Sequence, residues 1–375
     1  MNGSSFDWQL SETDDALQQL LVQHAQCEAV VVDTEFMRRD TFFPRAALIQ
    51  LCFVGSNTAW LLDPLRIADF TPLKKLFADT AVVKIIHSPS EDLEVFQHFL
   101  GTLPEPLFDT QRAAAFLNLG FGLGYRALVE QMSGLEIPKG ETRSNWLARP
   151  LSEAQLAYAA QDVIPLAPIY SEMMRQLQRS GRLEWLLEDG AQAVAAARGE
   201  GAPAYHRIKS AWKLNRLQLA ALAALCDWRE QRARQLDKPR NWILQDKVCL
   251  QIAEQGPRNL DDLLRIQDLP AATLRKQGER LLEVLSSDLQ GERPAPLPRP
   301  LSAAQRETLK ALKQAARELA ANWELAAEVL LPAKDYELMV RLGAGEELSR
   351  PAHWDGWRAQ RLIEPLLQLS TQRAQ

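Results

Sequence analysis

The sequence predicts an α/β domain around a mixed sheet, followed by two all-α units. In the first part, short runs rich in Val, Ile and Leu alternate with helical patterns, whereas strand-like runs almost disappear after residue 205. Breaks at residues 199–203 and 291–300 separate the parts, and alternate prolines make the second break a stiff, extended spacer. The expected domains therefore span residues 1–200, 206–290 and 297–375.

Strands come first in the α/β domain. Short apolar runs bounded by turn residues predict strands at 29–36, 46–55, 58–63 and 82–88, the first three forming a hairpin-like cluster. Helical spacing predicts helices over two later segments, residues 92–100 and 152–177.

Before the first of these helices, Ser88 and Glu91 have the spacing of a capping box. Pro89 suits the first helical position. We therefore expect Glu91 to have a structural role and Asp92 to be the carboxylate that is free to face a site.

The two later units show helical spacing, most clearly at residues 215–237 and 303–330. Residues 242–253 and 329–340 also align without gaps and match at an apolar pair and at a lysine. A degenerate repeat is the interpretation we favour, and chance similarity of two helical segments is the alternative.

Composition narrows the possible functions. Residues 1–205 contain 16 Lys and Arg against 26 Asp and Glu, whereas residues 206–290 contain 15 against 11. This division favours cation sites in the first part and a polyanion partner for the second. The four cysteines form no C-x-x-C pair, which argues against a disulfide framework or a zinc site. Without a leader pattern or a run of roughly 18 apolar residues, we expect a soluble cytoplasmic protein.

Two carboxylates end the first expected strand. Asp33 and Glu35 follow three valines, and because strand side chains alternate, both project to the same side. Such close carboxylates repel each other and raise their own pKa values unless a cation lies between them. A solvated strand end is the alternative.

Other candidates follow later elements. His87 could be a ligand, although we favour a packing histidine. Tyr158 and Asp162, four residues apart, share one helix face, as a surface hydrogen-bond pair also would. Tyrosine is a poor general base at its ordinary pKa, so we expect Tyr158 to orient a water molecule.

The carboxylates together predict a metal site. They offer only hard oxygen ligands, which favour Mg²⁺ or Mn²⁺ over Zn²⁺. Two such ions roughly 4 Å apart can hydrolyse a phosphodiester. The expected ligands are Asp33, Glu35, Asp92 and Asp162.

Three segments, DTEF, HSPSEDLEVF and YAAQD, resemble the exonuclease motifs of the DEDD superfamily in its tyrosine-bearing branch, and the wider pattern is similar to the ribonuclease D family. The histidine-bearing branch would need histidine where Ala157 stands. The sequence departs from the family at Asn145, usually Asp, and at Pro89 and Ser90, where small residues are usual; Asp92 keeps its register. The second unit resembles the HRDC domain, and the third resembles a diverged copy of it.

The resemblance implies a ribonuclease H-like exonuclease domain followed by two HRDC-type domains. It also implies 3′ to 5′ trimming of RNA, notably of tRNA precursors, with release of nucleoside 5′-monophosphates by a monomer without an obligate protein partner. In the hypothesis we favour, Asp33, Glu35 and Asp162 hold the ion that activates water. Asp33 and Asp92 hold the second ion, and Tyr158 orients the attacking water.

A further group of residues could contact RNA. In relatives, the equivalents of Thr34 and Phe36 meet the terminal nucleotide, although core packing is an equal alternative for Phe36. Arg38 and Arg39 could meet phosphates or form a solvated turn. In the second unit, positive charge surrounds one aromatic ring, a pattern suited to structured RNA; for that ring we favour a core position. These residues are Lys238, Arg240, Trp242 and Lys247.

Two other functions remain possible. One is a DNA-directed 3′ to 5′ exonuclease of the proofreading type, which shares these motifs. The other is a catalytically silent nucleic-acid-binding scaffold. The paired helical units argue against the first alternative, and the intact carboxylates argue against the second.

Overall fold

The computed structural model describes residues 6–138, 140–141, 144–199, 201–287 and 294–374. The chain divides into two compact units. Unit 1 comprises Met1–Met37, Arg45–Gly199 and Leu301–Gln375, and unit 2 comprises Arg38–Pro44 and Glu200–Pro300. The division therefore groups the third expected domain with the first. The expected domain limits stay a prediction. The limits at residues 200 and 290 lie outside the described residues, as do residues 291–293 at the start of the proline spacer.

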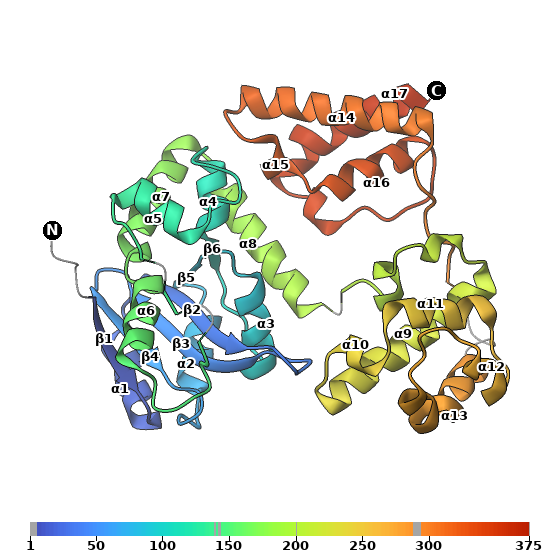
Figure 1. The fold of residues 1–375 in the computed structure, drawn as a ribbon. Coiled ribbons are helices and arrows are strands. Elements are labelled where there is room, and N and C mark those ends of the chain that lie inside the picture. The colour runs from blue at the N-terminus through green and yellow to red at the C-terminus, as the bar shows by residue number, and fades with distance from the viewer. Residues whose placement is uncertain (1–5, 139, 142–143, 200, 288–293, 375) are drawn as a thin grey trace. The chain divides into compact units, whose positions relative to one another are not determined.

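A six-stranded mixed sheet, in the order β1-β4-β3-β2-β5-β6, forms the centre of unit 1 (Figure 1). β2, β3 and β4 are antiparallel neighbours, whereas β1 runs parallel to β4, and β5 runs parallel to both β2 and β6. The predicted mixed sheet and its four expected strands are confirmed. The strands are β1 (Asp7–Ser11), β2 (Ala29–Met37), β3 (Arg45–Phe53), β4 (Thr58–Leu62), β5 (Val83–Ile86) and β6 (Leu107–Asp109).

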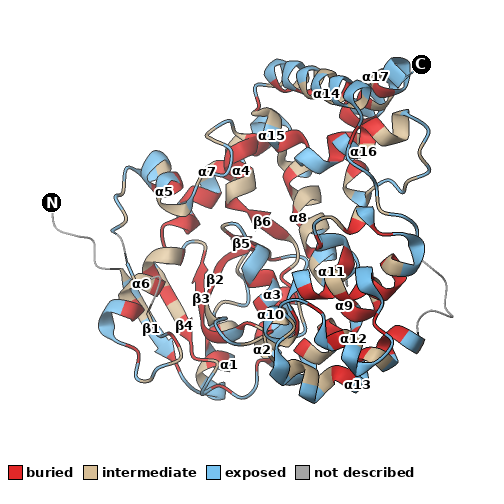
Figure 2. Cartoon of the chain, turned by 45° about the vertical axis from the view of Figure 1, so that its right-hand side comes forward, coloured by how far each residue is buried: buried red, intermediate tan, exposed pale blue. Residues whose placement is uncertain are grey.

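Helices cover both faces of this sheet because β2 alternates between two apolar cores. Val30 and Val32 pack in the core shared with α1, α2 and α3, whereas Val31 packs in the core shared with α4 to α7. Buried residues accordingly line β2, β3, β5 and β6 (Figure 2). The helices are α1 (Asp14–Gln23), α2 (Thr71–Ala78), α3 (Ser90–Phe99), α4 (Thr110–Phe116), α5 (Tyr125–Ser133), α6 (Glu153–Val163), α7 (Leu166–Ser180) and α8 (Leu183–Arg198).

Two expectations about helices were wrong. The single helix expected over residues 152–177 is two helices, α6 and α7, with Pro165 between them. Proline lacks the N–H that a continuous helix needs and interrupts it. The capping box expected at Ser88 is absent, because Ser88 has a left-handed backbone (φ 61°) and its N–H donates to Asp109, so α3 begins at Ser90 without a side-chain cap.

The last part of unit 1 is helical and packs on α8. Arg358 donates hydrogen bonds to both carboxylate oxygens of Asp189, at 2.6 and 3.0 Å, and Arg112 also pairs with Asp189. Nearby, Trp357 stacks on Trp185 with ring centroids 4.5 Å apart. The helices of this part are α14 (Ala303–Asn322), α15 (Ala327–Leu330), α16 (Ala333–Gly343) and α17 (Glu364–Ala374).

Unit 2 is all-α, as expected, apart from residues 38–44. Asp237 follows the end of α9, and its carboxylate accepts hydrogen bonds from the backbone N–H groups of Phe42 and Phe43, at 2.9 and 3.0 Å. Residues 38–44 are thereby attached to the helices of this unit. Its helices are α9 (Arg216–Leu236), α10 (Arg240–Ile243), α11 (Asp246–Gln255), α12 (Leu260–Leu264) and α13 (Ala271–Ser287).

The two aligned segments have the same local geometry. In each, a one-turn helix (α10 or α15) leads through two extended residues to a longer helix (α11 or α16). The first extended residue is Leu244 in one segment and Leu331 in the other, and both side chains are buried. This correspondence supports the repeat interpretation. Across the described ranges, no helix is both long and apolar enough to cross a membrane.

Candidate active site

β2 places Asp33 and Glu35 on the sheet face that packs against α6. Because side chains alternate along a strand, Asp33 and Glu35 point to the same face as Val31, whose side chain lies in the core shared with that helix. The pairing of β2 with β3 shifts register between Glu35 and Phe36, so an irregularity interrupts the ladder directly after the second carboxylate. The strand thus presents both carboxylates just before the irregular part of the hairpin.

Asp92 reaches the same region from the first turn of α3. Thr34 points to the opposite face from Asp33, and its hydroxyl donates to the Asp92 carboxylate at 2.5 Å. Both side chains are buried. The Thr34 hydroxyl that we expected near a nucleotide is therefore engaged with Asp92, and its contact with RNA stays a prediction.

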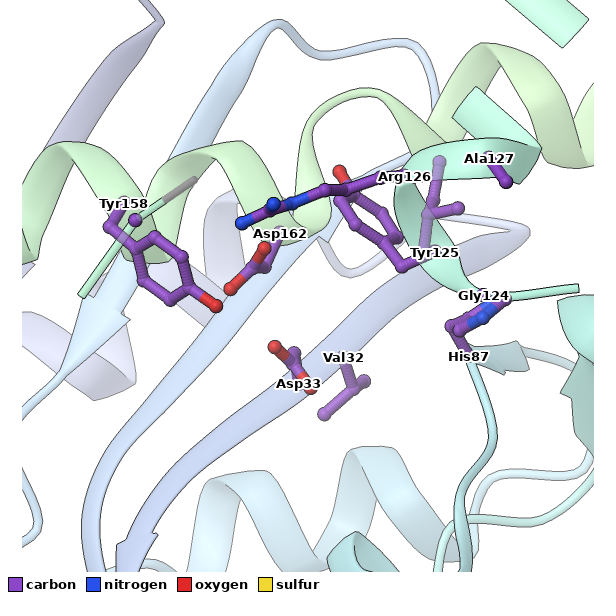
Figure 3. A pocket seen from close by; sticks show the side chains of 11 residues that line it. Val32, Asp33, His87, Gly124, Tyr125, Arg126, Ala127, Tyr158 and Asp162 are labelled. Atoms are coloured by element: carbon purple, nitrogen blue, oxygen red, sulfur yellow. The ribbon is translucent and has the colours of Figure 1, made fainter. Parts of the chain in front are cut away.

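α6 supplies Tyr158 and Asp162. The helix starts with a capping box made by Ser152 and Gln155, and one turn later the Tyr158 hydroxyl donates to the Asp162 carboxylate. A Cβ atom at Gly140 would overlap the Tyr158 ring, so the missing side chain there leaves room for this tyrosine. Figure 3 shows the Tyr158 hydroxyl and the carboxylates of Asp162 and Asp33 facing one space.

Burial raises the pKa of all four carboxylates, and neighbouring carboxylates add to the shift at two of them. Burial raises the pKa of Asp33 well above its ordinary value, and the charges of Asp92, Asp162 and Glu35 raise it further. Burial raises the pKa of Glu35 to about 9, with additional increases from Asp162 and Asp92. Burial also raises the pKa of Asp92 to about 6, despite the hydrogen bond from Thr34. The pKa of Asp162 rises to about 7 through burial, despite the hydrogen bond from Tyr158 and the charge of Arg126.

This charge balance fits a divalent cation. Several buried carboxylates cannot all ionise unless positive charge enters among them, and their oxygen atoms are the ligands that Mg²⁺ and Mn²⁺ prefer. In the part of the chain that the structure describes, no three His, Cys, Asp or Glu side chains already surround a point suited to a metal ion.

A pocket of about 700 Å³ lies beside these carboxylates. Asp33, Tyr158 and Asp162 line it, together with Tyr125 and Arg126 of α5 (Figure 3). Glu35 and Asp92 are not among its described lining residues. The structure thus brings three of the five expected catalytic residues to the pocket wall.

His87 also lines this pocket. Its Nδ1 lies 2.9 Å from the Thr110 hydroxyl, and burial lowers the pKa of His87 to about 4. The ring is therefore neutral near pH 7 and Nδ1 is hydrogen-bonded, whereas the buried Nε2 has no hydrogen-bond partner among the described residues, so the packing role of His87 stays a prediction.

Arg126 and Tyr125 line the pocket but were not among the residues predicted from the sequence. The Tyr125 hydroxyl donates to the backbone carbonyl of Gln161 in α6, which ties α5 to the helix that carries Asp162. The glycines before Tyr125, which end at the N-cap Gly124, were a usable signal for a helix start. No motif marks Arg126.

Most of the expected RNA contacts belong to unit 2 and engage in local interactions. Lys238 lies 3.8 Å from the Asp40 carboxylate, Arg240 pairs with Glu230, and Lys247 lies 3.1 Å from Asp268. Arg38 donates to a backbone carbonyl of its own loop, Arg39 is exposed, and Phe36, in unit 1, is half-buried.

The core position that we favoured for Trp242 was wrong. Its side chain is 63% exposed. α10 is a single turn without a buried residue, so it offers no core-facing position. The Lys238 ammonium lies 5.6 Å from the centre of the Trp242 ring. An exposed ring beside a cation is compatible with stacking on a base.

Comparisons with known proteins cover nearly the whole chain. Residues 8–178 match the 3′-5′ exonuclease family, and residues 218–285 match the HRDC domain. Ribonuclease D of Pseudomonas paraeruginosa is 41% identical over 345 residues, which cover 90% of this chain and 91% of that protein. Ribonuclease D of Escherichia coli is 34% identical over 371 residues, 96% of this chain and 97% of that protein.

One solved structure has the same fold over almost its full length. It is the crystal structure of Escherichia coli RNase D, described as an exoribonuclease involved in structured RNA processing. It has a TM-score of 0.90 and 33% sequence identity, and the match covers 98% of this chain and 100% of that one.

Proposed function

This chain belongs to the ribonuclease D family and is a 3′-5′ exoribonuclease, and from that premise we propose that it trims tRNA precursors and other structured RNAs by two-metal-ion hydrolysis. The observation that carries this proposal is the set of four carboxylates that lie close together near a pocket, where burial raises the pKa of each and neighbouring carboxylates add to the shift at Asp33 and Glu35. Such a set is suited to divalent cations and to the phosphate backbone that the cations would bind.

We keep the ligand roles that we expected from the sequence. Asp33, Glu35 and Asp162 would hold the first Mg²⁺ or Mn²⁺, and Asp33 and Asp92 would hold the second. When bound, such ions supply an activated water and stabilise the leaving oxygen of the phosphodiester. The hydrogen bond from Thr34 would fix the position of the Asp92 carboxylate.

Tyr158 would act as a hydrogen-bond donor. Burial and the nearby carboxylates raise its pKa well above the ordinary value, so the hydroxyl stays protonated at neutral pH and cannot serve as the base. Its place beside Asp162 suits it to hold the attacking water in line with the phosphate. Release of a nucleoside 5′-monophosphate would follow.

The substrate proposal rests on unit 2 and on the relatives. The sequence of unit 2 has a surplus of basic residues, and one solved relative is described as acting on structured RNA. We propose RNA, especially tRNA precursors with 3′ extensions, as the partner, and a monomer acting in the cytoplasm. Arg38, Arg39, Lys238, Arg240, Trp242 and Lys247, together with Thr34 and Phe36, stay the proposed substrate contacts.

A nuclease assay tests the proposal. The purified protein is given Mg²⁺ or Mn²⁺ and 5′-labelled RNA or DNA of one sequence, with free or blocked 3′ ends, beside the Asp33→Asn variant. We expect stepwise shortening of RNA with a free 3′ end, and loss of that activity with a chelator or in Asp33→Asn. Activity that survives either change contradicts the two-metal mechanism, and a preference for DNA supports the proofreading-type alternative.

A further inference from the structure

α5 directs one arginine into the pocket from the side opposite Asp33. Leu128 and Val129 of this helix are fully buried, and the hydrogen bond from Tyr125 to Gln161 ties its first turn to α6. With the helix held in this way, the Arg126 side chain extends along the pocket toward Asp162 and Tyr158 (Figure 3). The position of Arg126 is thus set by the fold of unit 1.

Arg126 is the only lysine or arginine among the described residues that line the pocket. Its charge acts on Asp162, yet within the described ranges no salt bridge below 4 Å and no hydrogen bond joins its guanidinium to another residue. An arginine that served only to neutralise Asp162 would be expected to pair with it directly. The guanidinium donors therefore remain available to a ligand in the pocket.

The expected ligand carries negative charge into an acidic site. An RNA phosphate approaching Asp33 and Asp162 is repelled by their carboxylates, and a guanidinium on the facing wall offsets that repulsion. Guanidinium also matches phosphate geometrically, because two of its N–H groups can donate to two oxygens of one phosphate.

We propose that Arg126 binds the nonbridging oxygens of the RNA phosphate nearest the 3′ end, the phosphate that leaves with the released nucleotide. This inference rests on the proposed function, because it assumes that the RNA 3′ end enters this pocket. Arg126 is then a substrate-binding residue in addition to the proposed substrate contacts of the motifs and of unit 2.

The test compares a ligand with and without the phosphate. Adenosine 5′-monophosphate and adenosine are titrated by calorimetry into wild type, Arg126→Gln and Arg126→Lys, with Mg²⁺ present. We expect Arg126→Gln to bind the monophosphate about 10- to 100-fold more weakly and adenosine unchanged, as for a lost hydrogen bond to a charged group. The affinity of Arg126→Lys for the monophosphate should lie between those of wild type and Arg126→Gln, because lysine keeps the charge but cannot donate two parallel hydrogen bonds.

Controls separate this role from the others. Arg175 pairs with Glu172 on the surface of α7, so Arg175→Gln should bind both ligands like wild type. If Arg126→Gln binds the monophosphate as tightly as wild type, the inference is wrong. It is also wrong if the variant only raises the Mg²⁺ concentration needed for binding and keeps the ratio between the two ligands, because Arg126 would then support Asp162.

Failure of the proposed function has a different signature. In the nuclease assay, the proposed function fails if the wild-type protein does not shorten RNA or if the Asp33→Asn variant still does. The calorimetric comparison does not depend on turnover, so unchanged affinity of Arg126→Gln for the monophosphate would count against Arg126 alone.

Discussion

Glu35 is a residue whose ionisation the fold opposes strongly. Burial and the neighbouring carboxylates raise its pKa from 4.5 to about 9. Between these two values the folded protein keeps a proton that the unfolded chain releases, so Glu35 lowers the free energy of unfolding as the pH rises through that window. We expect metal-free Glu35→Gln to lose less stability than wild type between about pH 5 and about pH 9, as measured by urea unfolding.

Mg²⁺ provides the matching control. Mg²⁺ should reduce the pH dependence of the free energy of unfolding of wild type, because a bound cation favours the ionised carboxylate. Parallel curves for wild type and Glu35→Gln without metal would show that Glu35 does not keep its proton in the folded protein.

Gly140 allows a second test at the level of one residue. A methyl group there would overlap the Tyr158 ring, so Gly140→Ala must displace the proposed water-orienting hydroxyl. We expect kcat on single-stranded RNA to fall by about 10- to 100-fold, as for a misplaced catalytic group. In a Tyr158→Ala background the same substitution should have no further effect. A full additional loss there would place the cause outside Tyr158.

Among the elements, local patterns explain which parts of the fold the sequence revealed. β2, β3, β4 and β5 are apolar runs whose spacing is visible over a few residues, whereas β6 has three residues and β1 carries a mostly polar pattern. Likewise, Asp33 with Glu35 and Tyr158 with Asp162 were recognisable because each pair lies within one element.

Contacts between distant segments had no such signal. The Thr34 hydroxyl meets Asp92 from 58 residues away, and Arg126 reaches the pocket from a helix without a motif. The false capping box shows the same limit, because a carboxylate 21 residues away holds the Ser88 N–H. Tertiary hydrogen bonds override local preference at such points.

The loop at residues 38–44 gives a prediction for one element. Asp237 accepts from the N–H groups of both Phe42 and Phe43, and it has a left-handed backbone (φ 46°). Asp237→Ala removes the acceptor and should lower the free energy of unfolding by about 1 to 3 kcal/mol. Hydrogen exchange at the Phe42 and Phe43 amides should accelerate in the same variant.

Two other substitutions at Asp237 separate the causes. Asn keeps an acceptor oxygen and tolerates the left-handed backbone, so Asp237→Asn should change little. Glycine keeps only the backbone freedom, so Asp237→Gly should still show fast exchange at both amides. Protected amides in Asp237→Gly would mean that the carboxylate does not hold the loop.

At the scale of the whole chain, the C-terminal helices α14 to α17 belong to unit 1, which also contains the exonuclease motifs. Residues from Leu301 to Leu366 share one apolar core with α4, α6 and α7, so their removal would expose a core surface as well as delete a possible RNA-binding element. Truncation is therefore a poor test of RNA binding by these helices, and a point substitution in their attachment to α8 is more informative.

Asp189 of α8 is a suitable position for this substitution. It is 9% exposed and pairs with Arg358, itself 6% exposed, and with Arg112. Asp189→Ala leaves buried guanidinium charge without its carboxylate, which should lower the free energy of unfolding by about 3 to 5 kcal/mol. Glu184→Ala, at an exposed position of the same helix, should stay within about 0.5 kcal/mol of wild type in the same urea titration. Equal stability of the two variants would show that the C-terminal helices are held by apolar packing alone, with Trp185 and Trp357 as its centre.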